Sequence, residues 1–217
     1  MTRAVARRAT ALVLVYPDRA ALQVVVDGST LLRRCVEAVS ASRHVAKVVV
    51  AAPPAWVTMA ADAVEGLNCE VVGFSFSDHP VQDLAHNVAA SGQEILVVHD
   101  GARGTVGPEL VDAVINEVLN GASACAPLAI VTDTVKRVTD GKVQATVDRE
   151  TLVSLQTPQA FAVKDLRPVS NSPLLLLDVS GDVRYIPGGP EAQRIPVPEA
   201  GVLAEALMRW RQITEVH

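Results

Sequence analysis

The sequence has 217 residues, of which 49% are hydrophobic, 20% are charged and only 3% are aromatic. This balance excludes an intrinsically disordered chain, and the scarcity of aromatic side chains means that Ala, Val and Leu must fill the core. The net charge of −5 argues against a general nucleic-acid partner, and no apolar run is long enough to span a membrane. The three cysteines lie among apolar neighbours, as buried thiols do in the reducing cytoplasm, where we expect this protein. We expect residues 1–217 to form one domain.

Short β-branched runs alternate with helical patterns along the chain. The runs are Ala11–Tyr16, Val45–Ala52, Cys69–Phe74, Ile95–Asp100 and Cys125–Val131. Each is apolar almost throughout, which is typical of parallel strands that are covered on both faces of a sheet. Their alternation with helices predicts an α/β protein with an open, mostly parallel sheet.

Helical patterns lie between these strands and near the end of the chain. Ser29 can cap the first helix, whose apolar residues recur on one face. The segments Pro80–Ser91 and Val106–Gly121 show the same periodicity. Pro198–Arg211 begins with proline and carries basic residues in its last turn, as helices favour.

One segment interrupts the alternation, because two moderately polar runs, Thr134–Val138 and Val143–Arg149, flank an Asp140-Gly141 pair. Asp-Gly between β-branched runs indicates a hairpin, since glycine readily adopts the positive φ of a tight turn. Neither run is apolar enough to be buried on both faces, so we predict a projecting β-hairpin arm over residues 132–152. A two-stranded ribbon is marginal alone, and we expect this one to pack against a second copy in a homodimer.

Polar residues at strand ends are the candidates for a site, because open parallel sheets bind ligands outside the carboxyl ends of their strands. Asp100 ends a buried run and Arg103 follows three residues later. This pair suits a divalent metal beside a phosphate-bearing ligand, but equally Asp100 can cap the loop with Arg103 as a solvated charge. His99 has no second His or Cys at ligand spacing and is expected in the core. By themselves, Arg194 and the polar residues of the hairpin indicate only solvated surface.

Four short motifs occur along the chain in one order: Val97–Arg103 (VVHDGAR), Thr132–Val138 (TDTVKRV), Val147–Arg149 (VDR) and Gln156–Phe161 (QTPQAF). Together they resemble the 2-C-methyl-D-erythritol 4-phosphate cytidylyltransferase family, and the resemblance runs from about Leu12 to Leu207. It implies a Rossmann-like nucleotidyltransferase fold and a dimer in which the arm crosses into the partner subunit. It also implies transfer of a cytidylyl group from CTP to a phosphorylated sugar alcohol in the non-mevalonate isoprenoid pathway, with release of pyrophosphate and with Mg²⁺ as cofactor.

The resemblance assigns substrate-binding roles to four residues. Arg103, Thr134 and Arg149 match residues that hold the phosphorylated substrate, the last two by reaching into the partner's site. Glu191 stands where the family has an aspartate, so the sign of its charge is kept.

The resemblance also assigns nucleotide-binding and catalytic roles. Asp100 matches the aspartate that binds the metal and the nucleotide, and Asp83 stands where a serine helps to seat the cytosine. Arg194 takes the place of a lysine and, with Arg19, is expected to be catalytic, although a guanidinium fork differs in shape from an ammonium group.

The chain departs from the family pattern after its first strand, where the family carries a glycine-rich loop with an arginine and then a Pro-Lys pair that grip the triphosphate. Here the stretch Pro17–Leu22 contains no glycine, and Asp18 stands where an anion should bind. Ala21 lies about where the lysine belongs, which leaves Arg19 as the one cation for a phosphate. Losing a lysine and two or three donors removes on the order of 5–9 kcal/mol, or roughly four to six decades of rate or affinity. We therefore expect impaired nucleotide binding.

Functions of different classes stay open on this reading. The first is a family member that still transfers a nucleotidyl group, which the surviving polar motifs favour. The alternative is a catalytically inactive paralogue that acts as a binding or regulatory dimer, which the missing glycine-rich loop favours. A third is a nucleotide-sugar transferase in which His99-Asp100-Gly101 imitates a metal-binding motif, and the hairpin signature argues against it.

Overall fold

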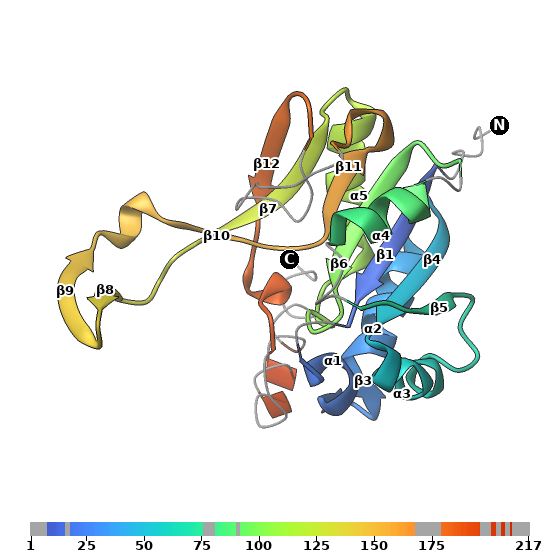
Figure 1. The fold of residues 1–217 in the computed structure, drawn as a ribbon, viewed down its shortest axis with the longest axis horizontal. Coiled ribbons are helices and arrows are strands. Elements are labelled where there is room, and N and C mark those ends of the chain that lie inside the picture. The colour runs from blue at the N-terminus through green and yellow to red at the C-terminus, as the bar shows by residue number, and fades with distance from the viewer. Residues whose placement is uncertain are drawn as a thin grey trace.

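A computed structural model describes residues 8–15, 18–75, 81–89, 92–167, 179–195, 201–202, 205–206 and 209. In Figure 1 a twisted central sheet has helices on both faces, and a thin two-stranded arm projects from one side of it. The predicted α/β class with a mostly parallel sheet and a projecting hairpin is therefore confirmed.

The described residues form a central sheet of eight strands: β1 (Ala9–Leu14), β4 (Val45–Ala52), β5 (Glu70–Gly73), β6 (Ile95–Asp100), β7 (Ala124–Ile130), β10 (Val153–Leu155), β11 (Gln159–Ala162) and β12 (Val183–Pro187). Their order is β10-β7-β11-β6-β1-β4-β5, and β12 also pairs with β7. The strands β6, β1, β4 and β5 run parallel, whereas β11 is antiparallel to both of its neighbours. The chain leaves β1 toward β4 and β5 and then returns to β6 on the other side of β1. Strand order thus reverses between β1 and β6, where open sheets bind ligands.

Helices connect the strands within the described ranges: α1 (Ala20–Gln23), α2 (Leu31–Ala41), α3 (Val57–Ala63), α4 (Val81–Ala89) and α5 (Pro108–Leu119). The cap of α2 is Thr30 and not the predicted Ser29, because Thr30 has the extended backbone of a cap and its hydroxyl accepts the N–H of Arg33 at 3.2 Å. Ser29 instead pairs in a small ribbon made by β2 (Val25–Val26) and β3 (Ser29–Thr30). Those parts of the predicted helix at 198–211 that are described are helical, namely residues 201, 202, 205, 206 and 209. No described helix is both long and apolar enough to cross a membrane.

The core lies on both faces of the sheet, as the continuous apolar strands predict. Along β1, Ala11 and Val13 face the buried cluster that includes α2 and α5, while Leu12 and Leu14 face a second cluster with Phe161. Small and branched aliphatic residues make up most of both clusters. This composition agrees with the low aromatic content of the chain.

The arm consists of β8 (Val135–Thr139) and β9 (Lys142–Val147), which pair antiparallel in a separate two-stranded sheet. Asp140 and Gly141 have φ values of 50° and 72°, so the turn has the geometry that the Asp-Gly signal predicts. Val138 and Val143 face each other across the ribbon and are 55% and 64% exposed. The arm therefore carries an apolar pair that its own protomer does not cover.

Candidate functional site

Asp100 lies at the point where strand order reverses, at the end of β6 and opposite Leu14 at the end of β1. The chain must pass very close to β1 here, because the N–H of Gly101 donates to the carbonyl of Leu14 at 2.9 Å. A Cβ at Gly101 would lie 3.0 Å from that carbonyl oxygen and 3.2 Å from the Cβ of Ala21. Packing at 101 is thus tight, and a side chain there would push against the end of β1 and against Ala21.

The Asp100 carboxylate is both a loop cap and the centre of a charge cluster. The predicted cap is therefore present, whereas Arg103 is a largely buried partner of Asp100 and not the solvated charge that the same interpretation expected. Its Oδ1 accepts the N–H of Ala102 at 2.9 Å. Its Oδ2 accepts Nε of Arg194 at 3.0 Å and lies 3.5 Å from Nε of Arg103. The side chains of Asp100 and Arg103 are only 17% and 14% exposed, which strengthens these interactions relative to a solvated surface.

The loop after β6 is joined to a distant segment that carries Glu191 and Arg194. The guanidinium of Arg103 donates to the carbonyl of Ala192, the hydroxyl of Thr105 donates to the carbonyl of Glu191, and the N–H of Ile195 donates to the carbonyl of Ala102 at 3.0 Å. Burial lowers the pKa of Arg103, which the Asp100 charge partly opposes.

Arg194 bridges two carboxylates. Besides Asp100, its Nη2 donates to Oδ1 of Asp18 at 2.9 Å, and the same oxygen accepts the N–H of Ala20 at 2.9 Å. Partial burial would lower the pKa of Arg194 and raise that of Asp18, but their hydrogen bonds dominate, so the pKa of Arg194 is raised and that of Asp18 is lowered. Sequence reasoning placed an acid at 18 and a cation at 194 but missed that they pair.

The glycine-free stretch after β1 folds as the short helix α1. Ala21 is buried in the core, and the N–H groups of Leu22, Gln23 and Val24 donate to main-chain carbonyls of Arg19 and Ala20. The guanidinium of Arg19 stacks over Trp56, 5.1 Å from its ring centroid. The main-chain N–H groups of Leu22, Gln23 and Val24 are thus engaged within the protein.

Thr157, in the segment Gln156–Phe161, holds the end of β6 through two hydrogen bonds. Thr157 Oγ1 accepts the N–H of Asp100 at 3.1 Å and is hydrogen-bonded to Nδ1 of His99 at 2.9 Å. Complete burial, and then the charge of Arg103, lower the pKa of His99 to about 3. His99 therefore lies in the core, as its lack of a ligand partner predicts, and it braces the strand end that carries Asp100.

Gln156 holds the loop that precedes Arg194 through its side-chain amide. Its side-chain amide donates to the carbonyl of Gly189 at 2.9 Å and accepts the N–H of Gly189 at 3.1 Å, which closes a two-bond pair. Sequence reasoning did not find this contact, because Gly189 is 33 residues away and its part in the pair is purely main-chain.

A cavity of about 660 Å³ opens beside the cluster, between the base of the arm and the loop that precedes Arg194. It is lined by Arg103, Ala129, Ile130, Val131, Thr132, Asp133, Ser154, Gln156, Gly188, Gly189, Pro190, Gln193 and Arg194. Two guanidinium groups line this cavity, and guanidinium N–H groups are donors that suit the oxygens of a phosphate.

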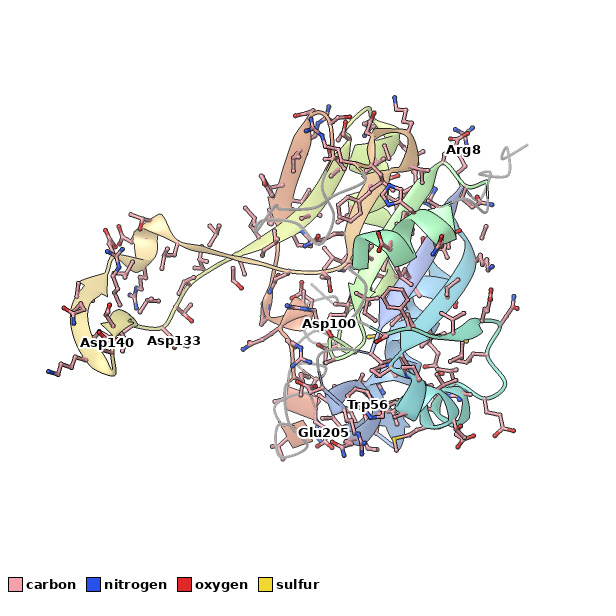
Figure 2. All side chains as sticks on the ribbon, in the orientation of Figure 1. Arg8, Trp56, Asp100, Asp133, Asp140 and Glu205 are labelled. Atoms are coloured by element: carbon pink, nitrogen blue, oxygen red, sulfur yellow. The ribbon has the colours of Figure 1, made fainter. Side chains whose placement is uncertain are left out.

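The structure brings only some of the predicted site residues together. Glu191 joins Asp100, Arg103 and Arg194 through the contacts of its segment, whereas Arg19 packs on Trp56. Thr134 and Arg149 belong to the arm, and Figure 2 shows how far the arm residues Asp133 and Asp140 lie from Asp100. Arg149 there donates to the carbonyl of Thr132 at 2.7 Å. Asp83 lies in the first turn of α4 with an exposed side chain.

Comparisons of the sequence and of the structure with known proteins agree on one family. The family model described as 2-C-methyl-D-erythritol 4-phosphate cytidylyltransferase matches residues 18–209. A protein of that name from Frankia casuarinae is 37% identical over 195 residues, covering 84% of this chain and 72% of its own. One from Saccharopolyspora erythraea is 32% identical over 206 residues, covering 85% and 89%. The crystal structure of such an enzyme from Thermus thermophilus superposes with a TM-score of 0.70 at 26% identity, over 91% of this chain and 98% of that one.

Proposed function

The chain belongs to the 2-C-methyl-D-erythritol 4-phosphate cytidylyltransferase family, and on this premise we propose that it is a cytidylyltransferase of isoprenoid biosynthesis whose hold on the nucleotide is impaired. In the proposed reaction a phosphate oxygen of a sugar-alcohol phosphate attacks the α-phosphorus of CTP. A new P–O bond forms as the bond to the β-phosphate breaks, and pyrophosphate leaves with the bonding electron pair. The products are a cytidine-diphospho sugar alcohol and pyrophosphate.

The observation that carries this proposal is the convergence of Arg103 and Arg194 at one wall of the cavity beside Asp100. Guanidinium groups bind phosphate through paired hydrogen bonds, and the cavity volume is in the range of small-molecule sites. Both arginines are held by the surrounding chain, so they are oriented before a ligand arrives. Preorganised cations of this kind stabilise the charge that develops on a transferring phosphoryl group.

The weak step is nucleotide binding. A triphosphate needs main-chain donors and cations between β1 and α2, where the N–H groups of Ala20, Leu22, Gln23 and Val24 already have acceptors in the protein. The cation Arg19 is stacked on Trp56. Because these groups are already engaged, we expect CTP to bind weakly. The same observation favours a second candidate function, an inactive paralogue that binds a phosphorylated ligand without transferring a nucleotide.

Mg²⁺ is the metal that membership of the family implies, and Asp100 is the residue that would hold it. Both of its oxygens are engaged, by Ala102 and by Arg194, with Arg103 adjacent. Among the described residues, no three His, Cys, Asp or Glu side chains gather where they could hold a metal ion. A divalent cation does not fit this arrangement unless Arg194 leaves Asp100, so no step of the proposed reaction is assigned to a metal.

The arm supports a homodimer as part of the proposed function. Its apolar pair, Val138 and Val143, is exposed in one protomer. Thr134 and Arg149 are also exposed, so in a dimer they are free to contact the partner's phosphorylated substrate.

Pyrophosphate release from CTP and 2-C-methyl-D-erythritol 4-phosphate tests the proposal. Enzymes typically turn over at about 10 s⁻¹, and a loss of four decades or more from that rate predicts about 10⁻³ s⁻¹ or slower. Arg194→Gln should abolish this release, while Arg8→Gln, which removes an exposed guanidinium paired with Glu94, should leave it unchanged.

The other results each have a meaning. Turnover at an ordinary rate would contradict impaired nucleotide binding. Binding of the sugar-alcohol phosphate without any release of pyrophosphate would favour the inactive paralogue, and absence of both would overturn the proposal.

A further inference from the structure

Asp18 and Asp100 share one guanidinium, that of Arg194. Arg194 donates through Nε to Asp100 at 3.0 Å and through Nη2 to Asp18 at 2.9 Å. Two of the nitrogens through which this guanidinium could bind a phosphate therefore already donate to carboxylates of the chain itself.

The two carboxylates are not held equally. Asp100 is 17% exposed and is tied to its own loop by the N–H of Ala102, whereas the side chain of Asp18 is 44% exposed. An anion that approaches Arg194 from solvent therefore meets Asp18 as the more accessible competitor.

Asp18 also stands on a particular side of Arg194. It comes from the segment between β1 and α1, and the described residues that line the cavity include Arg194 but not Asp18. A phosphate inside the cavity can reach Arg103 and Arg194 without displacing Asp18, whereas an anion on the β1 side must replace it.

Charge counting points the same way. Asp18 and Asp100 balance Arg103 and Arg194, so these four ion-paired side chains carry no net formal charge and exert little attraction on a polyphosphate. Removing the charge of Asp18 would leave these four side chains with a net charge of about +1 and would weaken the hydrogen bond that Nη2 of Arg194 makes at this position.

We propose that Asp18 is a specificity-determining residue whose carboxylate competes with the phosphates of a nucleotide for Arg194, so that the site admits a phosphate monoester in the cavity and disfavours a polyphosphate beside β1. This inference rests on the proposed function, because it assigns the two sides of Arg194 to the two substrates. It predicts that nucleotide binding is restrained by this one side chain as well as by the missing glycine-rich loop.

Calorimetric titration with inorganic pyrophosphate, at fixed ionic strength and without divalent metal, tests the inference on the full chain. We expect Asp18→Asn to bind pyrophosphate about tenfold or more tightly than the wild type, because a charge-assisted hydrogen bond becomes available to the ligand. Asp18→Glu, which keeps the carboxylate, should stay close to the wild type. Asp62→Asn, on an exposed position of α3, makes the same change in net charge and should also match it.

Equal affinity of Asp18→Asn and Asp62→Asn would overturn the inference, since charge alone would then explain any gain. Asp18→Ser serves the same purpose if the Asn variant does not fold, with folding checked by circular dichroism. The same proteins are titrated with 2-C-methyl-D-erythritol 4-phosphate. If the wild type does not bind 2-C-methyl-D-erythritol 4-phosphate but Asp18→Asn still binds pyrophosphate more tightly than Asp62→Asn, the proposed function is contradicted and the role of Asp18 is not. The reverse pattern would overturn the role of Asp18 alone.

Discussion

Acid should destabilise this protein through His99, whose side chain is fully buried at the end of β6. Burial and the nearby charge of Arg103 lower its pKa to about 3. The unfolded chain binds a proton at this residue near the ordinary value of about 6.5. Stability from neutral His99 is therefore present above pH 6.5 and is lost progressively as the pH falls toward 3.

The size of the effect follows from proton linkage. Between the two pKa values, each pH unit removes about 1.4 kcal/mol from the free energy of unfolding, because only the unfolded state takes up the proton. Since protonation is partial near 6.5, the loss between pH 7 and pH 5 comes to about 2 kcal/mol. That is a substantial share of the 5–15 kcal/mol, roughly, by which domains are stable.

Urea unfolding of the wild type and of His99→Gln at pH 7, 6 and 5 measures this loss. The variant changes packing as well, so the slope of stability with pH is the informative quantity and not the stability at one pH. We expect the wild type to lose about 2 kcal/mol more than His99→Gln between pH 7 and pH 5. Parallel slopes, or a His99 imidazole resonance that titrates by NMR near pH 6 in the folded protein, would refute the reasoning.

Three further variants examine the arm, the cavity wall and the charge cluster. Deletion of Val135–Thr146 should give monomers by analytical ultracentrifugation, and a dimer that survives the deletion would show that the arm is not the contact. Gln156→Ala removes both hydrogen bonds to Gly189; it should cost about 1–3 kcal/mol in urea unfolding and weaken binding of the sugar-alcohol phosphate. Unchanged ligand affinity in a destabilised Gln156→Ala protein would reduce this residue to a structural one. Asp100→Asn leaves Arg194 with one carboxylate fewer, and we expect the free energy of unfolding to fall by about 1–3 kcal/mol. An unchanged free energy of unfolding would show that this carboxylate is unimportant to the cluster.

Strands and turns could be predicted because their signals are local. The predicted runs Val45–Ala52 and Ile95–Asp100 match the strands of the structure at both ends. A strand that is covered on both faces is apolar along most of its length, so its extent can be recognised in the sequence. Asp140-Gly141 located the turn of the arm, because both residues adopt positive φ. The cap of α2 was displaced by one residue, since Ser29 and Thr30 carry equivalent hydroxyls and only the pairing of β2 with β3 decides between them.

The site was predictable only in part, because most of its contacts are between residues far apart in the sequence. Asp100 and Arg103 are neighbours in one loop, and their pairing has a local signal. Asp18 and Arg194 are 176 residues apart, and nothing in either segment indicates that they meet. The family resemblance supplied the position of Arg194, but its partner follows from a departure from the family pattern.

A crystal structure of the protein with CTP and 2-C-methyl-D-erythritol 4-phosphate is the most direct test of the site. The expected result is a sugar-alcohol phosphate in the cavity in contact with Arg103 and Arg194, with any bound nucleotide displacing Asp18 from Arg194. Main-chain N–H groups of residues 18–22 converging on an ordered triphosphate, with Asp18 still paired to Arg194, would contradict it.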